Sequence, residues 1–139
     1  MKLNKIIFIA LLSILLWGCG PIEEDTGAYN ANINGHWSQT SDILSDNCTP
    51  ANVGQESTVT FVLGEDGFGN IYVDGTLDPD TSYDDGTLTV VSFNINTNYQ
   101  YTKSLSFTDN DHATGTSSET LTINGTTCII TSTVTLTRI

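Results

Sequence analysis

Aspartate is concentrated in one short segment near the middle of the chain, and its carboxylates are the oxygen ligands that a hard cation needs. Asp78, Asp80 and Asp84 recur there much as the first ligands of a twelve-residue calcium loop do. Such a loop also requires glycine at its sixth position and glutamate at its twelfth, where this chain has Tyr83 and Thr89. The segment therefore carries two hypotheses, a calcium site and a solvated turn rich in aspartate and glycine.

The two histidines are the residues that could act as a general base or bind a transition metal. His112 follows Asp109 by three residues, so a carboxylate could orient its imidazole. Nothing marks a nucleophile for that base, because serine and threonine occur throughout the chain. His36 is the other histidine, and the two lack the third ligand of a catalytic zinc site. We therefore expect a protein without enzymatic activity and, calcium aside, without a cofactor.

The first residues have the arrangement of an export signal. Lys2 and Lys5 precede an apolar stretch, residues 6–17, that only Ser13 interrupts. As a helix this stretch would span roughly 18 Å, whereas the hydrocarbon core of a bilayer is about 30 Å thick. It is too short for an ordinary membrane span and has the flanks of a secretory signal.

The apolar stretch ends in Leu16-Trp17-Gly18-Cys19, which resembles the lipobox of bacterial lipoproteins. The resemblance implies that residues 1–18 are a signal peptide and that Cys19 carries the lipid. Two or three acyl chains anchor a protein stably where one does not. The implied location is the bacterial cell envelope, at the periplasmic or surface face of the outer membrane. The alternative is a plain secretory signal with an incidental cysteine.

Residues 19–34 are expected to be a flexible tether. They include Pro21, Gly27 and the acidic run Glu23-Glu24-Asp25. A coil of this length reaches about 20 Å on average, which would keep the following domain near the membrane.

Charge narrows the range of partners. Once residues 1–18 are removed, Lys103 and Arg138 are the only basic residues against sixteen acidic ones. Such a surface repels nucleic acid and anionic lipid headgroups. We therefore expect no nucleic-acid partner, and contact with the membrane only through the lipid on Cys19.

Cys48 and Cys128 are the remaining cysteines, and an even pair in an exported domain predicts a disulfide. Neither has C-x-x-C spacing or a neighbouring histidine, which disfavours a metal site or a redox pair. The bond would close a loop of about 80 residues, worth about 4–5 kcal/mol in the chain-entropy model.

Residues 35–139 are predicted to be one all-β domain. Every second residue of 58–63 is a large apolar one, the pattern of a half-buried strand. Asn124-Gly125 is a strong hairpin signal, and in the strand after it threonines face away from the series 128–136. No segment holds a helical period. Seven or eight strands at this spacing predict an antiparallel barrel or a β-sandwich.

Gly35-His36-Trp37 opens the first predicted strand, and Arg138 lies at the end of the last. This resembles the lipocalins and lipocalin-like barrels, in which a Gly-x-Trp motif packs its indole against an arginine of the final strand. The resemblance implies an up-and-down barrel in which Gly35, Trp37 and Arg138 form a structural clasp, with a β-sandwich as the alternative fold.

Tyr99, Tyr101 and Phe107 share one face of a predicted strand, together with Lys103. The aromatic side chains either line a ligand cavity or fill the core of a small barrel. A domain of about 105 residues uses most of its apolar side chains for its own core. The first hypothesis is therefore a structural or protein-interaction module that contacts another envelope protein. The alternative is a lipocalin-like protein that binds a small apolar ligand, which would require a cavity.

Overall fold

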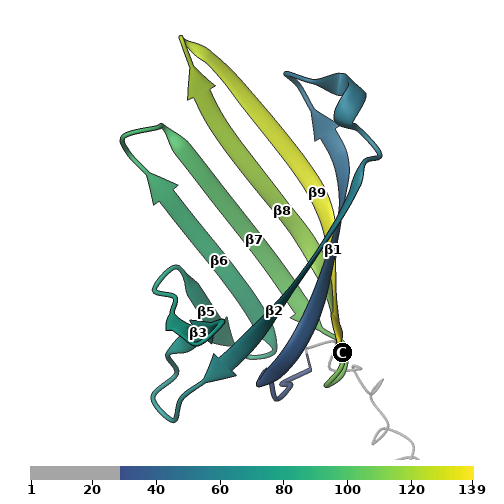
Figure 1. Ribbon diagram of the computed structural model, residues 1–139, viewed down its shortest axis with the longest axis vertical. Helices are drawn as coiled ribbons and strands as arrows, with labels where there is room; N and C mark the ends of the chain where they lie inside the picture. Colours follow the sequence, from purple (N-terminus) through teal and green to yellow (C-terminus); the bar gives the residue numbers. More distant parts are fainter. Residues whose placement is uncertain (1–28) are drawn as a thin grey trace, which may run out of the picture.

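The structure, a computed structural model, describes residues 29–139, which form a single antiparallel sheet (Figure 1). Its nine strands lie in the order β4-β3-β2-β1-β9-β8-β7-β6-β5, and a short 3-10 helix, η1 (Pro50–Asn52), follows β1. The strands are β1 (Gly35–Asp46), β2 (Glu56–Glu65), β3 (Ile71–Val73), β4 (Thr76–Leu77), β5 (Thr81–Asp84), β6 (Thr87–Asn94), β7 (Tyr99–Phe107), β8 (His112–Ile123) and β9 (Thr126–Arg138).

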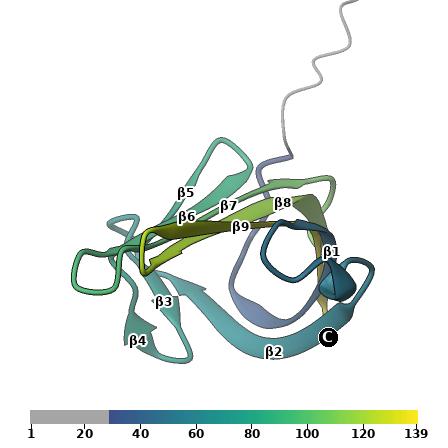
Figure 2. The ribbon, with the colours of Figure 1, turned by 90° about the horizontal axis from the view of Figure 1, so that it is seen from above.

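The sheet has an up-and-down topology and curls into a half-barrel. Each strand pairs with the next one in the chain, except that β4 does not pair with β5. In addition, β1 pairs with β9. The two edges of the sheet are β4 and β5, and seen from above β2 and β3 lie across from β6–β9 (Figure 2). The predicted all-β class and antiparallel pairing are confirmed. The β-sandwich alternative is wrong, because all nine strands belong to one sheet.

The predicted count of seven or eight strands is also wrong, and tight turns explain the difference. Asn124-Gly125 joins β8 to β9 with both residues at positive φ, as a type I′ hairpin requires. Asp74-Gly75 and Asp85-Gly86 have the same backbone geometry. The first turn joins β3 to β4 and the second joins β5 to β6, so the region between β2 and β6 forms short strands.

The hydrophobic core lies against the concave face of the sheet, toward one end. We call this the closed end, and the opposite end, with the β6–β7 and β8–β9 turns, the open end (Figure 1). Side chains alternate along each strand, so every second residue of β7, β8 and β9 points to the concave face, and those near the closed end enter the core. The buried apolar residues are Ala31, Ile33, Trp37, Leu63, Ile71, Leu88, Leu105, Phe107, Ala113, Val134 and Leu136.

Two core residues precede the first strand, which corrects the predicted boundary between tether and domain. Ile33 is fully buried, Ala31 is nearly so, and the amide of Tyr29 donates to the carbonyl of Phe107 at 2.9 Å. Residues 29–34 are therefore part of the domain. The sequence hides this because the two apolar residues stand alone among asparagines. The predicted signal peptide, Cys19 and the rest of the predicted tether lie outside the described residues.

Gly115 marks a close approach between neighbouring strands and provides a test of the packing. It pairs with Leu105 and Val134 in the middle of the sheet, and a Cβ added there would overlap the carbonyl oxygen of Ser104. We predict that Gly115→Ala destabilises the protein by about 3 kcal/mol, since the backbone itself must move. Urea unfolding measures the change. Gly67→Ala is the control, because nothing lies within 4 Å of its added Cβ. Equal stabilities of the two variants would contradict the described packing.

Candidate functional site

The concave face becomes polar immediately beyond the core. Lys103 of β7 pairs with Ser117 of β8, which in turn pairs with Ser132 of β9. The two serines are each only 8% exposed. Gln39 reaches the same region from β1. A row of polar side chains therefore crosses the concave face next to the buried apolar cluster.

Lys103 is the central residue of this row. Its Nζ donates to Oε1 of Gln39 at 2.9 Å and lies 5.9 Å from the centroid of the Phe61 ring. Burial lowers the pKa of Lys103, and the charge of Asp78 opposes this change. The ion pairs within residues 29–139 are His112–Asp109 and Arg138–Asp111. Lys103 thus holds its charge in a half-buried position without a carboxylate at ion-pair distance.

Two cavities meet at Lys103. The first, about 370 Å³, extends over β6–β9, and its lining includes several hydroxyl groups. The second, about 360 Å³, lies between β2, β3 and β6, and the walls of both cavities are mostly apolar. The first is lined by Leu44, Thr89, Thr102, Lys103, Ser104, Thr116, Ser117, Ser118, Thr131 and Ser132. The second is lined by Gln39, Val59, Thr60, Phe61, Leu63, Val73, Asp74, Asp78, Thr81, Leu88, Val90 and Lys103.

The sequence predicted that three aromatic residues could line a cavity. Neither of the two cavities is lined by Tyr99, Tyr101 or Phe107. Phe107 is 2% exposed and makes edge-to-face contacts with Trp37 and Tyr83, each at 5.6 Å between ring centroids. It fills the core, as the alternative interpretation held. Tyr99 and Tyr101 lie farther along β7, where burial and then the charge of Glu119 raise the pKa of both hydroxyls. The sequence predicted correctly that Lys103 lies on the same face of β7 as these aromatic residues, but it predicted no role for the lysine.

The aspartates of the calcium hypothesis do not converge. Asp78 accepts hydrogen bonds from the amide of Asp80 at 3.0 Å and the hydroxyl of Thr81 at 2.8 Å. Asp84 lies on β5 and lines a different cavity, with Asp85. Within residues 29–139 no group of three or more acidic, histidine or cysteine side chains is arranged to hold a metal ion. The geometry supports the other hypothesis, in which the carboxylates stabilise turns.

The histidines lie away from the cavities. Nδ1 of His112 is 3.0 Å from Oδ1 of Asp109, and both side chains are more than half exposed. The amide of Asp111, and then His112, lower the pKa of Asp109. This contact secures the turn between β7 and β8. His36 is exposed, on the opposite side of β1 from Trp37.

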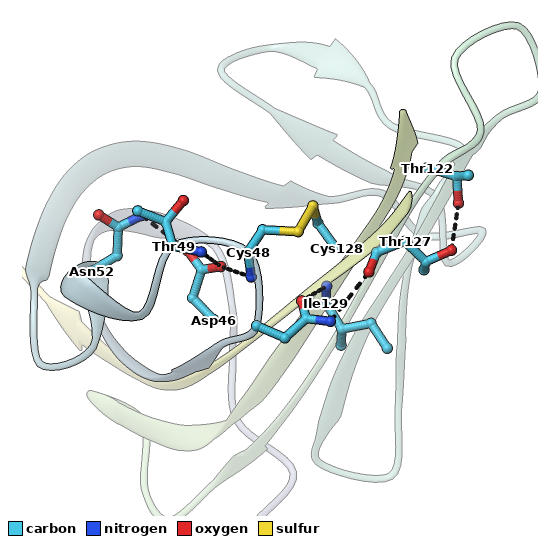
Figure 3. The surroundings of a disulfide bond; sticks show 9 residues. Asp46, Cys48, Thr49, Asn52, Thr122, Thr127, Cys128 and Ile129 are labelled. Carbon is cyan, nitrogen blue, oxygen red and sulfur yellow. Dashed lines mark hydrogen bonds between the residues drawn. A yellow bond between two sulfur atoms is a disulfide. The ribbon is translucent and has the colours of Figure 1, made fainter. Parts of the chain in front are cut away.

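The predicted disulfide between Cys48 and Cys128 is confirmed, with 5.4 Å between the Cα atoms. It ties the loop after β1 to the start of β9 (Figure 3). Asp46 organises the same loop by accepting hydrogen bonds from the amides of Cys48 and Thr49 and from the side chain of Asn52. The Thr49 amide contributes most to lowering the pKa of this carboxyl, which burial opposes.

Gly35, Trp37 and Arg138 lie together at the closed end. The Arg138 guanidinium carbon is 4.4 Å from the centroid of the Trp37 ring, and the buried indole donates to the carbonyl of Ile33 at 2.8 Å. A Cβ on Gly35 would overlap Arg138. The guanidinium also donates to the backbone carbonyls of Asn32, Asn34 and Asn110. This contact joins the first strand, the last strand and residues 29–34.

The described chain thus belongs to the all-β class, with one curled antiparallel sheet and a half-buried lysine between two cavities on its concave face. No protein-family model matches this chain, and no curated protein matches its sequence. Within residues 29–139 there is no helix with the length and hydropathy to cross a membrane.

Arg138 offers a test of the closed end. We predict that Arg138→Met destabilises the protein by about 2–4 kcal/mol, because several backbone carbonyls lose a charged donor and the indole loses a cation on its face. Thermal unfolding measures the loss, and the near-ultraviolet circular dichroism of Trp37 reports the local change. The control is His36→Ala, at an exposed position of β1 next to Trp37. Its stability should stay within about 0.5 kcal/mol of the wild type. If Arg138→Met lost no more stability than His36→Ala, the contact between Arg138 and Trp37 would not stabilise the closed end.

Proposed function

We propose that this protein is a non-enzymatic, lipid-anchored binding protein of the bacterial cell envelope that holds a small ligand on its concave face. The observation that carries the proposal is the pair of adjoining cavities there, about 360 and 370 Å³. Ligand sites are concave, largely apolar and provided with a few polar groups, and volumes of about 300–1,000 Å³ are usual. Lys103 and Gln39 are such polar groups.

The fold that we propose in detail is a lipocalin-like barrel that is open along one side. Its support is the up-and-down strand order, the pairing of β1 with β9, and the contacts among Gly35, Trp37 and Arg138. The open side lies between β4 and β5, the two edges of the sheet. A ligand could enter the concave face along this side without passing through the core.

The proposed anchor is the lipid on Cys19, after removal of residues 1–18, and the proposed location is the outer membrane at its periplasmic or surface face. The described chain starts at the closed end, where Tyr29 bonds to Phe107. A tether joined there would leave the open end of the half-barrel directed away from the anchor.

The second candidate is the structural or protein-interaction module that the sequence favoured. Sheet edges commonly bind a partner by adding a strand. Here the edges are β4 and β5, of two and four residues, and short edge strands discourage such pairing. The cavities therefore support ligand binding more than protein interaction.

The anchor is tested by replacing its cysteine. We predict that Cys19→Ser abolishes incorporation of radiolabelled palmitate into the protein in the producing bacterium. Cys48→Ala/Cys128→Ala is the control and should retain the label. Label in the Cys19→Ser protein would show that the lipid is attached elsewhere, and absence of label from the wild-type protein would show that the signal is an ordinary one.

Ligand binding is tested on the full acylated protein in lipid nanodiscs with a neutral probe, decanol carrying a diazirine. We predict that photolysis labels peptides of β2, β3 and β6, which line the second cavity. Val90→Trp should reduce this labelling about tenfold or more by filling the cavity. The matched control is Val91→Trp, at an exposed position on the opposite face of β6. Labelling that is absent or spread evenly over the chain would refute a ligand site here.

A further inference from the structure

Most of β2 has a neighbouring strand on only one of its two sides. On one side β1 pairs with it continuously from Glu56 to Leu63, whereas on the other β3 pairs only with residues 63–65. Figure 2 shows β3 and β4 beside one end of β2. Among residues 29–139, no strand pairs with the outer side of residues 56–61, which we call the free edge of β2. The short strands β4 and β5 end the sheet, but they leave this segment uncovered.

The backbone groups of the free edge are directed outward and are accessible. The carbonyl of Val62 accepts from the amide of Asp74 at 2.9 Å, and the amide of Val62 donates to Oδ1 of Asp74 at 2.8 Å. Both groups of Val62 therefore point away from β1. Successive residues of a strand direct these groups to its two sides in turn. Glu56, Thr58 and Thr60 thus direct their amides and carbonyls to the outer side, and all three are exposed.

The free edge lacks the features by which proteins usually prevent an edge strand from pairing. These features are a very short strand, a lysine, a proline or a bulge. Residues 57–61, Ser-Thr-Val-Thr-Phe, are uncharged and rich in β-branched side chains, and their register with β1 is regular. Val59 lines the second cavity on the concave face but is still 52% exposed. A strand added beside β2 would cover this side chain.

Carboxylates at both ends of the free edge indicate the charge of the strand that would fit it. Glu56 pairs directly with Asp42 of β1, and Asp74 lies at the opposite end. The ion pairs within residues 29–139 involve none of these three carboxylates. Like charges on directly paired residues destabilise a sheet, and a cation from a partner relieves that repulsion. A second copy of this chain, with its net charge of −12, would increase the repulsion instead.

We propose that the free edge of β2 binds an extended segment of another protein, in which basic and apolar residues alternate, as an added antiparallel strand. This direction continues the ladder of β3, which also runs antiparallel to β2. The inference goes beyond the proposed function and does not require a ligand in the cavities.

The register of β2 fixes which side of the added strand is basic. In an antiparallel pair, residues directly opposite each other have their side chains on the same face of the sheet. Residues that bond to Thr58 and Thr60 therefore lie on the convex face. The carboxylates of Asp42 and Glu56 are on that face too, so these residues carry the basic side chains. The residues between them face the concave side, next to Val59, and carry the apolar side chains.

Two N-methylated peptides test this geometry. The probe is the fluorescein-labelled peptide KVKVKV, titrated against the full acylated protein in phosphatidylcholine nanodiscs, with fluorescence anisotropy as the measurement. N-methylation of every lysine removes the amides directed to β2, and N-methylation of every valine removes those directed away from it. The two isomers have the same charge and composition. We expect the isomer methylated on lysine to bind about tenfold or more weakly than the isomer methylated on valine.

Position 58 provides a matched pair of protein variants. Thr58→Pro removes an outward amide and no bond to β1, and proline is tolerated at such a position of an edge strand. We expect this variant to bind the unmethylated peptide about tenfold more weakly than the wild type. Thr58→Val keeps the amide and should bind as the wild type does. The peptide EVEVEV should bind the wild type about tenfold or more weakly than KVKVKV.

Each outcome bears on a separate statement. Equal binding of the two isomers, or no binding of KVKVKV to the wild type, would overturn strand addition at this edge. Equal binding of EVEVEV would overturn the basic partner, and so would efficient disulfide-linked dimers of Thr58→Cys, because a second copy would then occupy the edge. If Thr58→Pro fails to fold, as judged by its melting temperature, the two isomers on the wild-type protein still decide. None of these results affects the proposed ligand site, which is tested by photolabelling.

Discussion

A single sheet has no second layer to cover its apolar face, so it must bury that face by curling onto itself. The pairing of β1 with β9 makes this possible, since it joins two of the longest strands and brings residues from both ends of the described chain together. The bulge between Ile43 and Ser45 bends β1 within that ladder. Trp37 and Arg138 are paired at the other end of the ladder, and there residues 29–34 complete the core. The closed end therefore depends on contacts between segments about a hundred residues apart.

The opening of the half-barrel follows from local chemistry on the opposite side. Asp74-Gly75 and Asp85-Gly86 reverse the chain twice within a few residues, so β3, β4 and β5 are too short to extend the ladder across the gap. The disulfide cannot close it either, because Cys48 lies beside β9. The ladder is therefore interrupted between β4 and β5, and the polar side chains Lys103 and Gln39 lie against cavities on the concave face.

The features that the sequence predicts correctly are either local, such as a turn, or have a single possible partner, such as a disulfide. The Asn124-Gly125 hairpin needs only two residues, and the Cys48–Cys128 bond joins the two cysteines that remain in the described chain. The period of two sets Lys103 on the inward face of β7, but its burial depends on how far the sheet curls, which no local pattern encodes. Ile33 was missed for the same reason, since its neighbours in space lie on distant strands. The three aspartates left two hypotheses open because identical residues favour turns and metal ions alike, and their geometry supports the turns.

The distribution of charge places a further condition on what can bind. The protein carries a formal net charge of −12, so its long-range field repels every anion that approaches. Lys103 and Arg138 are the basic residues of the described chain, and the guanidinium of Arg138 is engaged with backbone carbonyls at the closed end. A small hydrophilic anion would gain one contact with Lys103 against this repulsion. Burial of apolar ligand surface adds a favourable free energy that is independent of the field, at about 25 cal/mol per Å² of surface buried. The field therefore disfavours small hydrophilic anions, and apolar contact with the cavity walls is the main source of binding free energy on the concave face.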